Sequence, residues 1–210
     1  MKIGIFGAGG FGREVLPEIR AANPNADIAF VVDIVTKEDN TINGINVISL
    51  EQAINQRRHL SLAVADWRTR ERISGVMEEN GVAHFDMFAK SAIIYDAVDI
   101  SPGAILCANS MITSNVRIGK CFHSNIYSYV AHDCVIEDYV TFAPRVCCNG
   151  NVVVGRGAYI GTGAVLKQGS SASPLMIWAG AVIGMGAVVT KKVPAGCVVV
   201  GNPARPIDRS

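Results

Sequence analysis

The chain has 210 residues, half of them hydrophobic and 18% charged, with a formal net charge of +1. This near-neutral balance, without a lysine and arginine cluster, argues against a protein that captures nucleic acid electrostatically. No stretch approaches the ~18 uninterrupted apolar residues of a membrane span, and the first residues lack a signal-peptide pattern, so we expect a cytoplasmic protein.

The first part of the chain, residues 1–88, alternates predicted strands with predicted helices. The expected strands are 2–6, 28–32 and 60–65, and the expected helices are one carrying Val15, Leu16 and Ile19, a short one opened by a capping box at Ser49–Gln52, and 69–80 capped by Gly81. Pro17 lies within the first helical pattern, so that helix either kinks or begins late. The alternation implies a small parallel sheet in an α/β domain.

From Ile94 to Leu166 the hydrophobic rhythm changes to a period of six. Stepping by six gives thirteen positions, and twelve of them are apolar, with Ser124 as the exception. The position four residues later is uncharged throughout and large only at Phe122. An insertion at 169–174 shifts the register by one, and the pattern resumes at Ile177, Ile183 and Val189.

Such a repeat is explained by a three-sided coil in which each aliphatic residue points inward. Six extended residues span ~20 Å, and coils stack on one another through backbone hydrogen bonds. No coil buries its apolar residues alone, so only a stack is stable. The sequence therefore predicts a parallel β-helix over residues 89–210.

Six cysteines lie in the second half of the chain without a C-x-x-C pair: Cys107, Cys121, Cys134, Cys147, Cys148 and Cys197. A metal or redox site is therefore not expected. We interpret these cysteines as small core residues in a reducing cytoplasm.

Five segments carry a resemblance to the hexapeptide-repeat acyltransferases, and within them to the sialic-acid O-acetyltransferase and bacillosamine N-acetyltransferase group. They are 7–15, 131–136, 150–155, 184–190 and 201–206. The resemblance covers essentially the whole chain. It implies that the β-helix is left-handed, that acetyl-CoA is the co-substrate, and that the protein is a homotrimer with each active site between neighbouring β-helices.

The resemblance identifies His132 as the general base of acetyl transfer. His132 follows the inward-facing Val130 by two positions, so it should project from the coil surface, where a histidine can also be merely solvated. An imidazole titrating near neutral pH can accept the proton of an attacking amine. Asp133 would orient the ring or stabilise imidazolium, unless it is an ordinary surface carboxylate.

Two further catalytic positions follow from the resemblance. Asn125 matches an asparagine near the reacting amine, and Gly150 matches a glycine whose backbone N–H faces the thioester oxygen. Such a donor supplies oxyanion stabilisation, although a simple turn glycine is the alternative for Gly150. Thr141 replaces a second histidine, Arg145 a common glycine and Trp178 an expected glycine, which leaves the acceptor side and one wall of the coenzyme A site in doubt.

The later coils would bind coenzyme A. The residues that match its binding positions are Gly161, Thr162, Gly163, Gly184, Gly186 and Ala187, with Lys191 or Lys192 available for phosphates. Small residues are also what tight coil packing requires, so both interpretations stay open.

The turn Gly7-x-Gly9-Gly10-x-Gly12 follows a predicted strand, and Asp33 ends the second one. This spacing meets the dinucleotide fingerprint of a Rossmann-like domain and by itself suggests NAD. The glycines, however, only open a helix N-terminus to an anion, and the domain is half the usual size. We therefore favour a nucleotide-sugar site without NAD, which Asp66 and Arg70 could complete unless they are solvated.

Three functions remain as hypotheses. The first is N-acetylation of a nucleotide-linked 4-amino-4,6-dideoxyhexose by direct attack, without an acyl-enzyme or a metal, for the synthesis of a surface glycan such as O-antigen, capsule or a glycoprotein sugar. The second is O-acetylation of a sugar hydroxyl, such as that of sialic acid. The third is a non-catalytic assembly protein that binds nucleotide.

Overall fold

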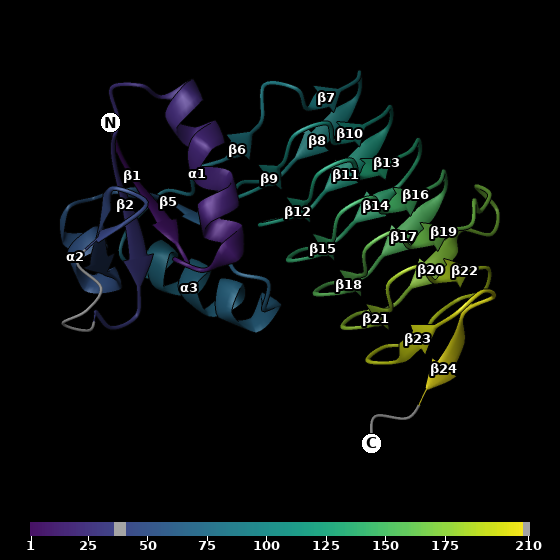
Figure 1. Cartoon of the computed structure of the whole chain (residues 1–210). Helices are drawn as coiled ribbons and strands as arrows, with labels where there is room; N and C mark the ends of the chain where they lie inside the picture. Colours follow the sequence, from purple (N-terminus) through teal and green to yellow (C-terminus); the bar gives the residue numbers. More distant parts are fainter. Residues whose placement is uncertain (36–40, 208–210) are drawn as a thin grey trace. The chain divides into compact units, whose positions relative to one another are not determined.

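The computed structural model describes residues 1–35 and 41–207 and divides the chain into two compact units (Figure 1). The first unit contains Met1–Lys90 and Pro102–Ile105. The second contains Ser91–Ser101 and the chain from Leu106 onward. Each unit has its own architecture.

The first unit is built on a five-stranded sheet with the order β3-β4-β2-β1-β5, parallel except for β3. Its elements are β1 (Lys2–Phe6), α1 (Gly10–Ala22), β2 (Asp27–Val32), β3 (Thr41–Ile42), β4 (Ile45–Ser49), α2 (Leu50–Asn55), β5 (His59–Leu62), α3 (Trp67–Glu79) and β6 (Met87–Phe88). The α/β sheet expected from the sequence is confirmed.

Local sequence patterns predicted most of these helices and strands close to their observed bounds. The capping box of α2 is present, because Ser49 Oγ accepts from the Gln52 N–H at 3.1 Å while Gln52 Oε1 accepts from the Ser49 N–H at 2.9 Å. Helix α1 begins at Gly10 and carries Pro17 in its interior, so it does not begin late. Strand β5 ends at Leu62, three residues before the expected end.

The hairpin of β3 and β4 was not anticipated. Its turn residues Asn43 and Gly44 have φ values of 47° and 75°, as a two-residue hairpin turn of type I′ requires. Strand β4 then pairs in parallel with β2, with Phe30 opposite Val47. The Asn-Gly dipeptide was the sequence signal for this hairpin.

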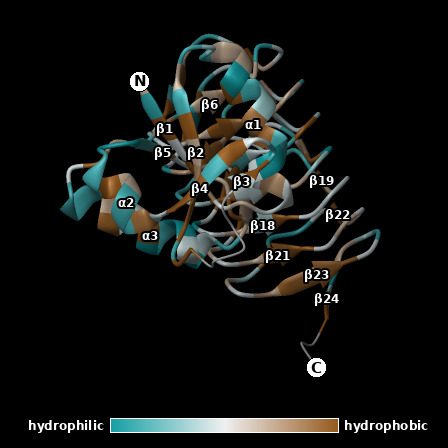
Figure 2. Cartoon of the chain, turned by 60° about the vertical axis from the view of Figure 1, so that its left-hand side comes forward, coloured by the Kyte–Doolittle hydropathy of each residue, from teal (hydrophilic) through white to brown (hydrophobic). Residues whose placement is uncertain are grey.

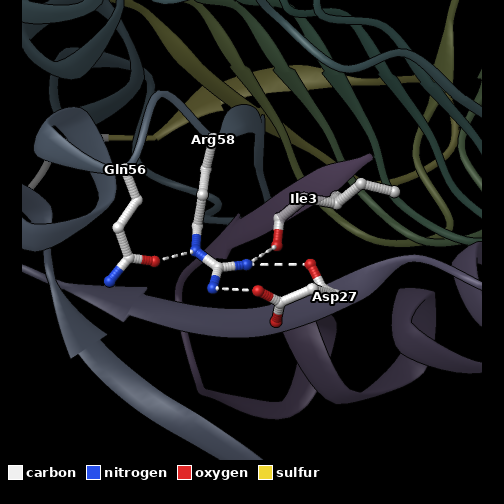
Figure 3. Close-up of polar contacts among 4 residues, drawn as sticks. All are labelled: Ile3, Asp27, Gln56 and Arg58. Atoms are coloured by element: carbon white, nitrogen blue, oxygen red, sulfur yellow. Dashed lines mark hydrogen bonds and ion pairs between the residues drawn. The ribbon is translucent and has the colours of Figure 1, made fainter.

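A buried arginine ties the strands together at one end of this sheet (Figure 3). Arg58 is only 5% exposed. Its Nη1 donates to the carbonyl oxygens of Asp27 at 2.8 Å and Ile3 at 3.3 Å, its Nη2 lies 2.8 Å from Asp27 Oδ2, and its Nε donates to Gln56 Oε1 at 2.7 Å. These contacts lie at the amino ends of β1 and β2, opposite the carboxyl ends where open α/β sheets bind ligands.

The second unit is a parallel β-helix made of three sheets. The first sheet contains β7 (Ile93–Ile94), β10 (Met111–Ile112), β13 (Tyr129–Val130), β16 (Cys147–Cys148), β19 (Val165–Leu166) and β22 (Val188–Val189). The second contains β8 (Val98–Ile100), β11 (Val116–Ile118), β14 (Val135–Ile136), β17 (Val152–Val154) and β20 (Leu175–Ile177). The third contains β9 (Ile105–Leu106), β12 (His123–Ser124), β15 (Thr141–Phe142), β18 (Tyr159–Ile160), β21 (Val182–Ile183), β23 (Val198–Val200) and the antiparallel β24 (Arg205–Ile207).

The coils repeat every eighteen residues, as the pairing of Met111, Tyr129, Cys147 and Val165 shows. The next partner is Val188, so the insertion lengthens that coil by five residues. From Leu106 onward every inward position of the period-six pattern is at most 2% exposed, which confirms this part of the predicted core, whereas Ile94 in the first coil is 40% exposed. Figure 2 shows the hydrophobic colouring of strands such as β18, β21 and β23.

Each corner of the prism requires a left-handed backbone conformation, because the chain turns there within one or two residues. Positive φ values accordingly recur every six residues. The non-glycine residues in this series are Ala97, Asn109, Asn115, Cys121, Tyr127, Asp133, Tyr139, Arg145 and Asn151. The backbone of Asp133 (φ 58°) is thus fixed by the architecture.

Replacing Arg58 by alanine should lower the free energy of unfolding of the first unit by about 2–3 kcal/mol, because buried carbonyls lose their donor. In a Trp178→Phe background, the fluorescence of Trp67 reports on this unit during denaturation. The exposed Arg20, which donates to the Asn43 carbonyl, is the matched control, with an expected loss below about 0.5 kcal/mol for Arg20→Ala. Equal losses of unfolding free energy in both variants would show that the contacts of Arg58 do not stabilise the sheet.

Candidate active site

The coil repeat stacks equivalent residues along the corners of the prism, and two corners carry the residues singled out by the sequence. We call the corner after β10, β13, β16, β19 and β22 the histidine edge, which contains residues 113–115, 131–133, 149–151, 167–169 and 190–192. We call the corner after β12, β15, β18 and β21 the glycine edge, which contains residues 125–127, 143–145, 161–163 and 184–186.

His132 and Asp133 form a hydrogen-bonded pair on the histidine edge. The distance from His132 Nδ1 to Asp133 Oδ2 is 2.7 Å, and their side chains are 48% and 47% exposed. The bond from His132 lowers the pKa of the Asp133 carboxyl, and a weaker bond from Asn115 Nδ2 at 3.3 Å adds to this effect. A carboxylate at Nδ1 assigns the proton to that nitrogen and leaves Nε2 as the acceptor.

Gly150 lies directly beside this imidazole, one coil further along the stack. A Cβ built on Gly150 would overlap the His132 ring, at 2.5 Å from Nε2 and 2.9 Å from Nδ1. The Gly150 carbonyl accepts from the Gly169 N–H at 2.9 Å, whereas the Gly150 N–H has no acceptor among the described residues. The structure thus brings together His132, Asp133 and a backbone donor, the Gly150 N–H, beside the ring.

Asn125 lies on the other edge. Its Nδ2 donates to the Phe142 carbonyl at 2.7 Å, which anchors the side chain to the next coil. Strand β13 separates it from His132 along the chain. Within one chain, the structure therefore does not place Asn125 beside the histidine.

The predicted coenzyme A residues divide into two groups. Gly163 and Gly186 are corner glycines (φ 69° and 66°) with open space where a side chain would be, and Thr162 beside them is exposed. Gly161 and Gly184 instead pack tightly, because a Cβ on either would contact the next coil at 2.7 Å. Ala187 is buried in the core.

Lys191 lies on the histidine edge, not with these glycines. It lines a hollow of about 210 Å³ together with Lys167, Gln168, Lys192 and neighbouring residues of the insertion. Three lysines around one hollow give it a positive charge. The sequence had suggested only Lys191 or Lys192 for phosphates, since the eighteen-residue stacking that adds Lys167 requires the insertion length.

The three departures from the family pattern have different surroundings. Thr141 is buried and pairs in register with His123, a buried histidine that the sequence analysis did not single out. Arg145 occupies a left-handed corner (φ 61°) with its guanidinium 6.0 Å from the Tyr127 ring. Trp178 is 49% exposed on the third corner.

In the first unit, the glycine-rich turn joins β1 to α1. Gly7 has φ 107°, and a Cβ on Gly12 would overlap the Gly7 carbonyl oxygen, so both glycines serve close packing. Gly9, the N-cap of α1, and Gly10 have open space around them. The turn therefore leaves the helix N-terminus approachable by an anion.

Asp33, at the carboxyl end of β2, is paired with an arginine that the sequence analysis missed. Arg72 Nη2 lies 2.8 Å and 3.0 Å from the two carboxylate oxygens of Asp33. Asp66 caps α3 by accepting from the Thr69 N–H at 2.8 Å, and its bond to the Thr69 hydroxyl lowers its pKa. Arg70 is fully buried on the inner face of α3.

Among the described residues, no group of three histidine, cysteine, aspartate or glutamate side chains could hold a metal ion. None of the helices in this part of the chain is long and apolar enough to cross a membrane.

Comparisons with known proteins cover both units. Residues 2–77 match the family model described as the PglD N-terminal domain. The GDP-perosamine N-acetyltransferase of Escherichia coli O157:H7 is 45% identical over 99% of this chain and 96% of its own length. The structure of WeeI from Acinetobacter baumannii AYE is 48% identical and has a TM-score of 0.93 over 99% of this chain and 100% of its own.

A more distant structure is the acetyltransferase domain of PglB from Neisseria gonorrhoeae FA1090, in complex with acetyl coenzyme A. It is 25% identical and has a TM-score of 0.87 over 98% of each chain. These similarities confirm an α/β domain that is followed along the chain by a left-handed β-helix.

The Gly150→Ala substitution should push the His132 ring away from Asp133, because a methyl group cannot fit beneath the imidazole. We expect the pKa of the Asp133 carboxyl, followed by carbon-detected NMR, to rise toward its ordinary value, since its main hydrogen bond is lost. His132→Ala gives the reference for complete loss of the bond. An unchanged Asp133 titration in Gly150→Ala would show that the ring and the glycine are not packed together.

Proposed function

The chain belongs to the hexapeptide-repeat sugar N-acetyltransferases, and from this we propose that it transfers the acetyl group of acetyl-CoA to the amine of GDP-perosamine or a closely related nucleotide-linked 4-amino-4,6-dideoxyhexose. The support for this substrate class is the 45% identity to a GDP-perosamine N-acetyltransferase, which extends through both units. The observation that carries the chemistry is the arrangement of His132, Asp133 and Gly150 on one corner.

In the proposed mechanism the sugar amine attacks the thioester carbonyl directly. Acetyl-CoA supplies the activated acyl group as co-substrate. His132 accepts the amine proton at Nε2, and Asp133 holds the ring through Nδ1 and stabilises the imidazolium that forms. The N–H of Gly150, which has no acceptor in the described part of the chain, donates to the developing oxyanion. The tetrahedral intermediate then collapses by breaking the carbon–sulfur bond, and coenzyme A leaves as a thiol after taking the proton from His132, so no acyl-enzyme is required.

We propose that each active site is formed by two chains of a homotrimer. Asn125 and the open corner at Thr162 lie on the glycine edge, whereas His132 and Gly150 lie on the histidine edge, so one prism cannot present both to one substrate. The face between these edges also carries an uncharged outward row. Its members are Ile93, Met111, Tyr129, Cys147, Val165 and Val188. An uncharged face of this length fits an interface between copies.

The positive hollow fits the phosphates of coenzyme A. Lys191 is three coils from His132 along the histidine edge, which corresponds to roughly 14 Å at the strand spacing of ~4.8 Å. An extended pantetheine arm can span such a distance. We propose that Lys167, Lys191 and Lys192 bind the phosphates while the thioester lies beside Gly150, and that the open glycine edge of the neighbouring chain covers the arm.

We assign the nucleotide of the sugar substrate to the first unit. The open surface of Gly9 and Gly10 at the helix N-terminus fits a diphosphate. Asp33, oriented by Arg72, is placed to accept hydrogen bonds from the nucleoside. Asp66 and Arg70 support this pocket indirectly, because one caps α3 and the other is buried within it.

The product would be a nucleotide-activated N-acetyl sugar, ready for a glycosyltransferase, and we propose that it serves the synthesis of a surface glycan. We place the reaction in the cytoplasm. All six cysteines lie in the described part of the chain and none of them forms a disulfide, which fits a reducing compartment.

His132→Ala should lower acetyl transfer at least ~100-fold, because the amine loses its proton acceptor. The measurement is thiol release from acetyl-CoA with GDP-perosamine, the corresponding UDP and dTDP amino sugars, and free sialic acid as acceptors. His59→Ala removes an exposed histidine of the first unit and should leave the rate unchanged.

Coenzyme A binding and assembly mass should persist in His132→Ala. Full activity of this variant would remove the histidine from its role. Transfer to the hydroxyl acceptor alone would replace N-acetylation by O-acetylation.

Two inactive variants should restore activity when assembled together. His132→Ala inactivates the histidine edge, and Thr162→Trp blocks the glycine edge with bulk. Mixed trimers purified through two different tags should regain about a third of the sites, because a trimer of either mixed composition joins an intact histidine edge to an intact glycine edge at one of its three interfaces. Absence of any recovery in trimers of normal mass would place the whole site within one chain.

A further inference from the structure

Cys134 lies directly behind the histidine edge, with its side chain inside the prism. The residue is 1% exposed. Its Sγ lies 3.2 Å from the carbonyl oxygen of Asn149 and 3.6 Å from that of His132. These two carbonyls belong to neighbouring coils, so one thiol connects the backbone of the proposed base to the backbone of the proposed oxyanion donor.

Packing alone does not require a thiol at this position. The residues at the same place one coil earlier and one coil later are Val116 and Val152, and both are fully buried. At equivalent corners elsewhere the prism accepts alanine, such as Ala158 and Ala164. The hydrogen-bonding capacity of Cys134 is therefore the property that distinguishes it from its neighbours.

The Asn149 carbonyl oxygen accepts the hydrogen bond from Cys134, and this carbonyl belongs to the same peptide group as the Gly150 N–H. Because the peptide group is planar, a hydrogen bond at the Asn149 oxygen fixes the direction of the Gly150 N–H as well. A bond accepted by the carbonyl also polarises the peptide and strengthens its N–H as a donor. Cys134 can thus influence the oxyanion donor without touching the substrate.

A second bond reaches the same residue from the side chain. The Tyr129 hydroxyl donates to Asn149 Oδ1 at 2.9 Å, while Asn149 Nδ2 donates to the Leu166 carbonyl at 2.8 Å. The latter bond has a counterpart in Asn125 and belongs to the corner architecture. The Cys134 thiol and the Tyr129 hydroxyl thus hold Asn149 at its backbone and at its side chain, and the Cys148 thiol lies 3.8 Å from the same carbonyl oxygen.

A serine elsewhere in the prism shows what a stronger donor does at this position. Ser128 Oγ donates to the Ala143 carbonyl at 2.8 Å, across the same separation of fifteen residues as Cys134 and Asn149. There the following residue is Pro144, which has no N–H. The same contact therefore affects an N–H donor beside the histidine and none on the glycine edge.

We propose that Cys134 is a positioning residue for acetyl transfer: its thiol orients and polarises the Asn149–Gly150 peptide so that the Gly150 N–H meets the oxyanion. Cys134 forms no covalent bond in the reaction. The inference rests on the proposed function, because the Gly150 N–H has this task only if a thioester is attacked beside it.

The test compares Cys134→Val and Cys134→Ala, which lack a donor, with Cys134→Ser, which keeps one. We expect kcat to fall roughly five- to tenfold in the valine and alanine variants, with KM for both substrates within about twofold. The serine variant should stay within about twofold of the wild type. Melting temperature and assembly mass should remain similar in the valine variant, since valine occupies this place in both adjacent coils.

The activities of the wild type and of the Cys134 variants distinguish a failure of the inference from a failure of the proposed function. A wild type that transfers acetyl, together with a fully active Cys134→Val, would overturn the inference alone. Equal losses in the serine and valine variants would also overturn it, because they would indicate packing instead of hydrogen bonding. A wild type without acetyl transfer would overturn the proposed function and the inference together.

Discussion

The stacking of eighteen-residue coils is the constraint on which the second unit depends. Each coil buries its inward residues only against the coils above and below it, so backbone pairing must keep the same register from Met111 to Val165. The corners then repeat one left-handed conformation every six residues. Side chains at a corner consequently have fixed neighbours, and His132 lies over Gly150 because eighteen residues separate them.

This stacking fixes the positions of the candidate catalytic residues on the histidine edge without a long loop. The imidazole is held by Asp133 at 2.7 Å and by the bare backbone of Gly150 on its other side. A side chain on the stacked residue would displace the ring. Within the part of the chain that the structure describes, the corner backbone also leaves the Gly150 N–H without an acceptor beside the histidine, and such a donor is what an oxyanion requires.

The two units offer different kinds of structure to the proposed substrates. In the first unit, Gly7 and Gly12 allow the turn to pack closely, and Gly9 and Gly10 leave the helix N-terminus open. In the second unit, the prism supplies long edges that suit an extended thioester. The candidate residues of the β-helix occupy two different edges, and the proposed homotrimer would bring one edge of each chain to the other edge of its neighbour.

The α/β class of the first unit and the three-sided coil of the second could be predicted from the amino-acid sequence, because strand–helix alternation and a period of six are local patterns that burial enforces directly. The resemblance to the hexapeptide-repeat acyltransferases singled out His132, Asp133 and Gly150, which the structure brings together on one corner. Which residues share an edge follows from the folded chain alone, because stacking depends on coil length and on the five residues added by the insertion. Three contacts join segments that are distant in the sequence, so no local pattern encodes them. They are the ion pair of Arg72 with Asp33, the hollow lined by both Lys167 and Lys191, and the hydrogen bond from Cys134 to Asn149.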